Sequence, residues 1–139
     1  MGMTTITVES LDHLQNRITS GNNTITADEP AVAGGDDSGF DPYSLLLAAL
    51  GACKSMTLKL YAKHKNWDLQ KVRVTLSHEK VHAQDCVDCE TKDVKLDTIR
   101  VKLEFEGNLS DEQKSRLKEI AKRCPIHRTL TSDIKIIDG

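Results

Sequence analysis

The chain has 139 residues, with 19 Lys and Arg against 21 Asp and Glu, and a pI near 6.2. This length suits one domain, 1–139, which buries roughly 70% of its unfolded surface and needs neither disulfides nor a metal to fold. Near-neutral charge and five aromatic residues argue against nucleic acid as a partner. The four cysteines, Cys53, Cys86, Cys89 and Cys124, are therefore available for chemistry.

The sequence also favours a soluble, cytoplasmic protein. The first ten residues, MGMTTITVES, lack the basic and apolar regions of a signal peptide. The longest apolar run covers 45–53, well short of the ~20 residues that span a bilayer, so we expect no membrane partner. In a reducing cytosol, thiols stay reduced unless they bind metal or do redox work.

The N-terminal third predicts a β-meander followed by a loop. Short strands are expected at 4–9, 14–19 and 24–27, and the Gly-Asn-Asn sequence at 21–23 indicates a tight hairpin turn. The Gly- and Asp-rich segment 28–41 has no apolar periodicity and is expected to form a loop. Loops of this length are often functional.

A long helix is expected from Pro42 to Tyr61, with Asp41 as its N-cap. Gly51 lowers helix propensity in its middle, which suggests that another element packs closely there. The helical spacing predicts one buried face that includes the first cysteine. Its members are Leu46, Ala49, Leu50, Cys53, Met56, Thr57 and Leu60.

Alternating apolar residues predict two long antiparallel strands at 72–79 and 99–106, joined by a polar tip at 82–95. Ser110 and Gln113 form a capping-box pattern that opens a second helix. Its apolar stripe is expected to include Cys124, with the helix ending there because Pro125 follows. A last strand is expected at 134–137.

If the two helical stripes pack together, Cys53 and Cys124 approach within the range of a disulfide. The alternative is that both are small buried apolar side chains, as free cysteine often is. Spacing alone leaves both interpretations open.

The amino-acid sequence around these cysteines resembles that of the OsmC/Ohr family of thiol-dependent peroxidases. The segments are DPYSLLLAALGACKSMTLKLYA (41–62) and RCPIHRTL (123–130), with ADEP followed by GG in the preceding loop, and the likeness covers nearly the whole chain. The resemblance implies an α+β fold with antiparallel sheets, a long central helix and a second shorter helix that each bear a cysteine, and an intertwined homodimer. It also implies that Cys53 is the peroxidatic thiol and Cys124 the resolving thiol.

The implied function is reduction of organic hydroperoxides in oxidative-stress defence, with no cofactor required. A thiolate attacks the peroxide to give a sulfenic acid, and a second thiol condenses with it to a disulfide. A small apolar hydroperoxide is the expected substrate, and a dithiol, such as a lipoylated protein, is the implied reductant. A non-catalytic module that holds a small molecule or a metal is the alternative.

The resemblance leaves several candidates for the cation that would activate the Cys53 thiol. Family members use an N-terminal Arg held by a Glu at the start of the cysteine helix, and Tyr43 occupies that Glu position here. Arg17 is the N-terminal candidate, although an ordinary strand-surface arginine is an equal interpretation. His127 or Arg128 would supply charge near the second cysteine, and Glu29 is a substitute carboxylate.

A second group of side chains, near the polar tip, has metal-ligand character. Two thiolates and two imidazoles make a tetrahedral zinc set, and C-x2-C is a suitable chelate spacing. A redox-active C-x2-C pair and a solvated tip without a role are the alternatives. The residues are His78, His82, Cys86 and Cys89.

Overall fold

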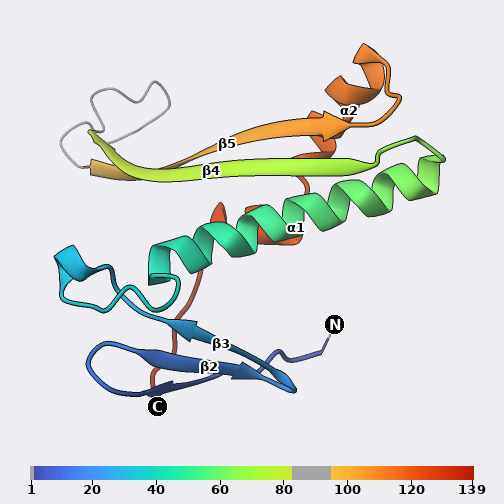
Figure 1. The fold of residues 1–139 in the computed structure, drawn as a ribbon. Coiled ribbons are helices and arrows are strands. Elements are labelled where there is room, and N and C mark those ends of the chain that lie inside the picture. Colours follow the sequence, from blue (N-terminus) through green and yellow to red (C-terminus); the bar gives the residue numbers. More distant parts are fainter. Residues whose placement is uncertain (1, 83–94) are drawn as a thin grey trace. The chain divides into compact units, whose positions relative to one another are not determined.

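The computed structural model describes residues 2–82 and 95–139 (Figure 1). The chain forms two compact units, Met1–Leu46 and Leu47–Gly139, and each is described by itself. Together they contain antiparallel sheets and three α-helices, so the predicted α+β class is confirmed.

The first unit holds the expected meander, in which β1 (Thr7–Ser10), β2 (Asn16–Ser20) and β3 (Asn23–Ala27) pair antiparallel in chain order. The turn between β2 and β3 has two residues, and the first, Gly21, has φ +57°. Glycine adopts this angle without steric cost, which is why the strands reverse there. The loop that follows contains one short 3-10 turn, η1 (Ala31–Ala33).

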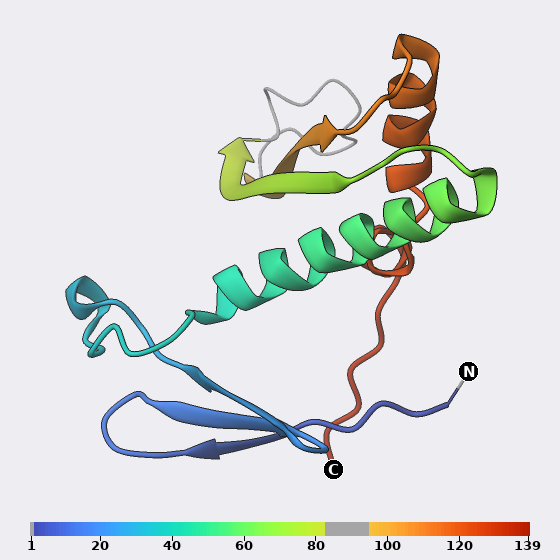
Figure 2. The same cartoon turned by 45° about the vertical axis from the view of Figure 1, so that its right-hand side comes forward.

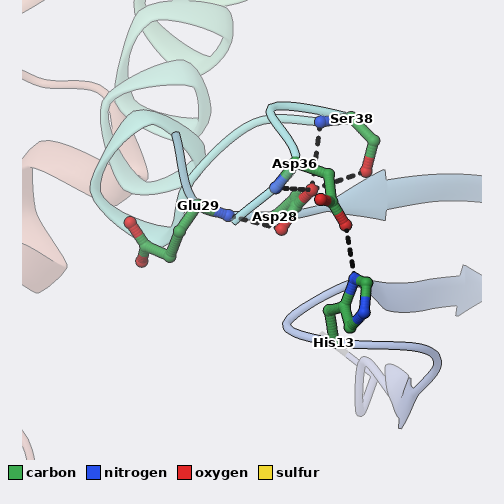
Figure 3. A network of polar contacts seen from close by, with 5 residues as sticks. All are labelled: His13, Asp28, Glu29, Asp36 and Ser38. Carbon is green, nitrogen blue, oxygen red and sulfur yellow. Dashed lines mark hydrogen bonds and ion pairs between the residues drawn. The ribbon is translucent and has the colours of Figure 1, made fainter. Parts of the chain in front are cut away.

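The Gly- and Asp-rich loop is held by the buried carboxylate of Asp28 (Figure 3). This carboxylate accepts hydrogen bonds from the backbone N–H groups of Glu29, Asp36 and Ser38 and from the Ser38 hydroxyl, at 2.7–3.1 Å. The Ser38 hydroxyl, followed by the backbone donors, holds the pKa of Asp28 below its ordinary value. His13 Nδ1 lies 2.9 Å from Asp36 Oδ2. The polar side chains of this loop therefore fix its own conformation.

The second unit is built on α1 (Pro42–Lys65), which lies along a two-stranded sheet in both views (Figures 1 and 2). The strands β4 (Lys71–His82) and β5 (Lys95–Glu106) pair antiparallel over their whole length, which confirms the predicted hairpin. A Cβ on Gly51 would lie 2.7 Å from Leu76 Cδ1. The glycine therefore lets the helix approach β4 closely, as the sequence suggested.

The third element of this core is α2 (Asp111–Ala121), which begins with the predicted capping box. Ser110 Oγ accepts from Gln113 N at 3.1 Å, and Gln113 Oε1 accepts from Ser110 N at 2.9 Å. Side chains from α1, α2 and the segment before β4 form one buried cluster, which joins these elements. Its members are Leu58, Ala62, Leu69, Leu117, Ile120 and Ala121.

The face of α1 that is buried differs from the predicted one. Leu46, Met56 and Leu60 are exposed, because the helix is apolar on most of its circumference and the apolar pattern alone does not select a face. Among the described helices, α1 alone is long and apolar enough to cross a membrane by length and composition, a test that core helices of soluble proteins also pass. The residues that are buried are Leu50, Gly51, Lys54, Leu58 and Ala62.

Two predictions for the C-terminal segment are wrong. Helix α2 ends at Ala121, and Pro125 opens a further helix, α3 (Pro125–Leu130), because proline is well tolerated at the first helical position. Cys124 is the N-cap of α3 and not part of the α2 stripe. Residues 134–137 form no strand, since no other described strand pairs with them, and Ile136 is 81% exposed.

Candidate active site

Two reduced cysteines lie together in the second unit. Cys53 is half-buried in the middle of α1, whereas Cys124 is fully buried at the N-cap of α3. The Cys53 side chain lies close enough to Cys124 to raise the pKa of the Cys124 thiol. Cys124 Sγ also accepts a hydrogen bond from His127 N at 3.3 Å. The pair thus consists of one thiol that solvent reaches and one that it does not.

Burial is the main reason that the pKa of Cys124 lies above its ordinary value, and the neighbouring Cys53 side chain acts in the same direction. The backbone N–H of His127 and the positive charge of Lys54 oppose this shift. A thiolate at Cys124 therefore depends on these two groups for its stability.

Lys54 is the unexpected member of the site. It follows Cys53 in α1 and is only 2% exposed. Its Nζ donates to the carbonyl oxygen of Ala121 and lies 2.8 Å from His127 Nδ1. Burial lowers the pKa of Lys54, while negative charge on Cys124 and Cys53 would raise it. The Lys54 ammonium and a Cys124 thiolate therefore stabilise each other.

His127 completes the arrangement as a neutral imidazole. Its pKa is lowered first by burial and then by the charges of Lys54 and Lys122. Because an ammonium group only donates, the Nδ1 atom that contacts Lys54 accepts, and the imidazole hydrogen is assigned to Nε2. His127 thus supplies its backbone N–H to Cys124 and its ring to Lys54, and the positive charge resides on Lys54.

Such an arrangement suits thiol redox chemistry. Two adjacent thiols can close a disulfide, and a buried cation raises the fraction of thiolate, which is the reactive form of cysteine. Of the two cysteines, Cys53 is the more accessible from solvent.

The other sequence candidates are divided between the two units. Arg128 is exposed in α3, where its backbone N–H donates to the carbonyl of Cys124. Arg17, Glu29 and Tyr43 belong to the first unit. Arg17 is exposed on β2, opposite Glu9, and Tyr43 is half-exposed in the first turn of α1. The Glu29 side chain points away from the Asp28 carboxylate (Figure 3).

The proposed zinc set is only partly described. His78 Nε2 lies 2.8 Å from Asp97 Oδ1, across the β4–β5 pair. Cys86 and Cys89 lie outside the described residues, as does the His82 side chain. Within 2–82 and 95–139, no group of three or more His, Cys, Asp or Glu side chains is arranged to hold a metal. The zinc interpretation therefore stays a prediction.

Sequence reasoning missed Lys54, although the sequence contains a signal for it. Lys54 stands four residues after Leu50 and four before Leu58, so it interrupts an otherwise apolar i, i+4 row. A charged residue inside such a row lies either at the edge of the buried face or in a polar site. To choose between these two positions, one must know which face of α1 is buried, and the apolar pattern of the helix did not show this.

The fold and the paired thiols define an α+β protein with a two-cysteine site. A family model described as OsmC-like protein matches residues 35–137. The match covers most of the chain, which therefore belongs to the OsmC-like protein family. No curated protein matches the chain.

Solved structures of the family share the fold. An OsmC-like protein from Mycoplasma pneumoniae is 24% identical, with a TM-score of 0.74 over 94% of this chain and 89% of that one. A putative osmotic stress induced and detoxification response protein from Psychrobacter arcticus is 20% identical, with a TM-score of 0.73 over 93% and 89%. The organic hydroperoxide resistance protein OhrB of Bacillus subtilis is 22% identical, with a TM-score of 0.61 over 95% and 93%.

Proposed function

We propose that the protein is a thiol peroxidase that reduces organic hydroperoxides, with Cys53 as the peroxidatic and Cys124 as the resolving cysteine. The observation that carries the proposal is a partly buried cysteine beside a fully buried one, next to the buried ammonium of Lys54. Membership of a family that includes organic hydroperoxide resistance proteins supports it.

In the first step, the Cys53 thiolate attacks the terminal oxygen of the hydroperoxide. A sulfur–oxygen bond forms, the oxygen–oxygen bond breaks, and the alkoxide leaves as an alcohol after taking up a proton. Cys53 is thereby oxidised to a sulfenic acid.

In the second step, the Cys124 thiolate attacks the sulfur of the sulfenic acid. The disulfide forms and hydroxide leaves as water, with the proton that Cys124 released. An external dithiol then reduces the disulfide by thiol–disulfide exchange and is itself oxidised. We infer a dithiol such as a lipoylated protein from the family resemblance.

The surroundings of Cys53 favour an apolar substrate. Met56 and Leu60 follow Cys53 at helical spacing, and Leu46 precedes it by two turns. All three are exposed, so an alkyl or aryl hydroperoxide meets apolar surface next to the thiol. We therefore expect turnover of cumene hydroperoxide to exceed that of hydrogen peroxide.

The same exposed residues support a homodimer. A helix that is apolar on most sides is normally buried on most sides, and a second copy of the chain would cover much of the exposed face of α1. The apolar surface next to Cys53 would then form a substrate pocket at the interface between the two copies. Light scattering is then expected to give twice the 15.4 kDa mass of one chain. A reduced thiol pair also suits the cytoplasm as the compartment of the protein.

Mass mapping of thiols after one equivalent of cumene hydroperoxide tests the proposed function. We expect a Cys53–Cys124 disulfide in the native protein, a trapped sulfenic acid in C124S, and no peroxide consumption in C53S. Persistence of both thiols in the native protein, or oxidation of Cys86 and Cys89 instead, would overturn the assignment.

A further inference from the structure

A cleft of about 550 Å³ lies in the second unit, on the side of Lys54 and His127. Its floor is the apolar face of β5, formed by Ile99, Val101 and Leu103. Cavities that hold small organic ligands commonly measure roughly 300–1,000 Å³ and combine an apolar lining with a few polar groups. The size and the floor of the cleft fit that description.

The polar lining of this cleft is basic. Lys118 and Lys122, from the C-terminal end of α2, join Lys54 around it, and no Asp or Glu from the described residues lines it. Lys102 also contributes, but its Nζ lies 3.6 Å from Glu104 Oε1. Three ammonium groups therefore border the apolar floor without a carboxylate among the lining residues.

These positive charges repel one another. After burial, which is the larger cause, the charge of Lys122 lowers the pKa of both Lys54 and His127. The carbonyl groups at the C-terminus of α2 amount to about half a negative charge, which offsets only part of three ammonium groups. A bound anion would supply the missing negative charge.

The apolar floor indicates what the anion carries. A free inorganic anion would leave Ile99, Val101 and Leu103 in contact with water, whereas an alkyl chain would cover them. A second cavity of about 220 Å³ shares Ile99 and Val101 with the first and adds further apolar side chains, together with Asp97, whose carboxylate is paired with His78 and Lys80. These added residues include Leu50 and Leu130.

We propose that this cleft binds an anionic amphiphile, with a carboxylate or phosphate head among Lys54, Lys118 and Lys122 and an alkyl chain on β5. This is a binding site in addition to the thiol pair. It does not depend on the proposed peroxidase activity, because binding is measured on the reduced protein without peroxide.

Calorimetric titration of the reduced full chain tests the site with four probes. Decanoate and decyl phosphate, which share the anionic head and the chain, are expected to bind once per chain. Decanol, which lacks the charge, and inorganic phosphate, which lacks the chain, are expected to bind at least about tenfold more weakly. The affinity for decanoate falls as salt is added, because the partly exposed charges are screened.

Substitutions test the lysines and the apolar floor of the cleft separately. The double substitution K118Q/K122Q is expected to weaken decanoate binding by about tenfold, since each partly exposed ion pair contributes up to about 1 kcal/mol. K114Q, one turn earlier in α2 and outside the cleft lining, is the matched control and is expected to change affinity less than about twofold. V101S is expected to weaken decanoate binding while leaving that of inorganic phosphate unchanged.

Three outcomes would overturn the proposal. The first is equal decanoate affinity of K118Q/K122Q and the native protein, with both folded by circular dichroism. The second is decanol binding as strong as decanoate binding. The third is a changed particle mass of K118Q/K122Q with no decanoate bound by the native protein, which would identify the cleft as a contact between copies of the chain.

Discussion

Substitution of Lys54 by Met tests whether the buried ammonium supports the resolving thiolate. Lys54 Nζ lies 2.8 Å from the ring of His127, the residue whose backbone N–H binds Cys124 Sγ, and its charge opposes the rise in the pKa of Cys124. At roughly 5 Å and an effective dielectric constant of about 20, an ion pair contributes about 3 kcal/mol, and access of water to the site reduces this to about 1–2 kcal/mol.

That energy corresponds to roughly 5- to 30-fold in the population of the Cys124 thiolate. A thiolate of higher basicity is also intrinsically more nucleophilic, with a Brønsted coefficient of about 0.4–0.5, which offsets nearly half of the loss on a logarithmic scale. We therefore expect K54M to slow disulfide formation by about 2- to 8-fold at neutral pH. Removing the cation raises the pKa of Cys124 further, so the increase of the rate with pH moves to more alkaline pH.

The assay is quenched-flow reaction with one equivalent of cumene hydroperoxide, followed by trapping of the sulfenic acid and mass spectrometry. The ratio of trapped Cys53 to Cys53–Cys124 disulfide at each time gives the rate of the second step alone. K59M is the matched control, because Lys59 lies on the same helix and also donates to backbone carbonyls, those of Leu69 and Gln70. Equal rates of disulfide formation in K54M and K59M, with the same pH profile, would refute the role of Lys54.

Three further predictions concern the fold. In Gly51→Ala, the contact of the new Cβ with the flexible end of Leu76 is expected to cost about 1 kcal/mol or more, which offsets the gain of about 1 kcal/mol in helix propensity, so that urea unfolding shows no net stabilisation. A gain of about 1 kcal/mol, which is the propensity effect alone, would contradict the close approach. Ser110→Ala removes the capping box and is expected to cost about 1 kcal/mol by the same measurement. Asp28, whose pKa is lowered in the folded state, stabilises the protein above about pH 4 and loses this effect as pH falls through its folded pKa, so Asp28→Asn is expected to remove that acid-dependent step from the unfolding profile.

The parts of the fold that the sequence predicted well are those with a local cause. The alternation in 72–79 and 99–106 gives one half-buried and one exposed face, and the structure has that arrangement. The capping box at Ser110 and Gln113 depends on two hydrogen bonds within four residues, and both are present. Such signals need no information about the rest of the molecule.

The failures have a common cause in long-range packing. The rotation of α1 is set by Leu76 against Gly51 and by the cluster around Leu58, which the apolar pattern of the helix does not encode. Pro125 ends one helix and begins the next, and local sequence alone favoured only the first role. The site was predicted at its two cysteines by resemblance, while its cation depended on the helix rotation and was missed.

The stability of K54M shows whether Lys54 serves mainly the Cys124 thiolate or mainly the packing of the core. Burial of an ammonium costs several kcal/mol, and among the described residues no carboxylate forms an ion pair with Lys54 to offset it. The substitution removes this cost but leaves the carbonyl of Ala121 and Nδ1 of His127 without their donor, at about 1–3 kcal/mol each. Because these effects have opposite sign and similar size, K54M is expected to unfold within about 1–2 kcal/mol of the native protein while its disulfide forms more slowly. A loss of more than about 4 kcal/mol in urea unfolding would instead show that the lysine serves mainly to hold α1, α2 and α3 together.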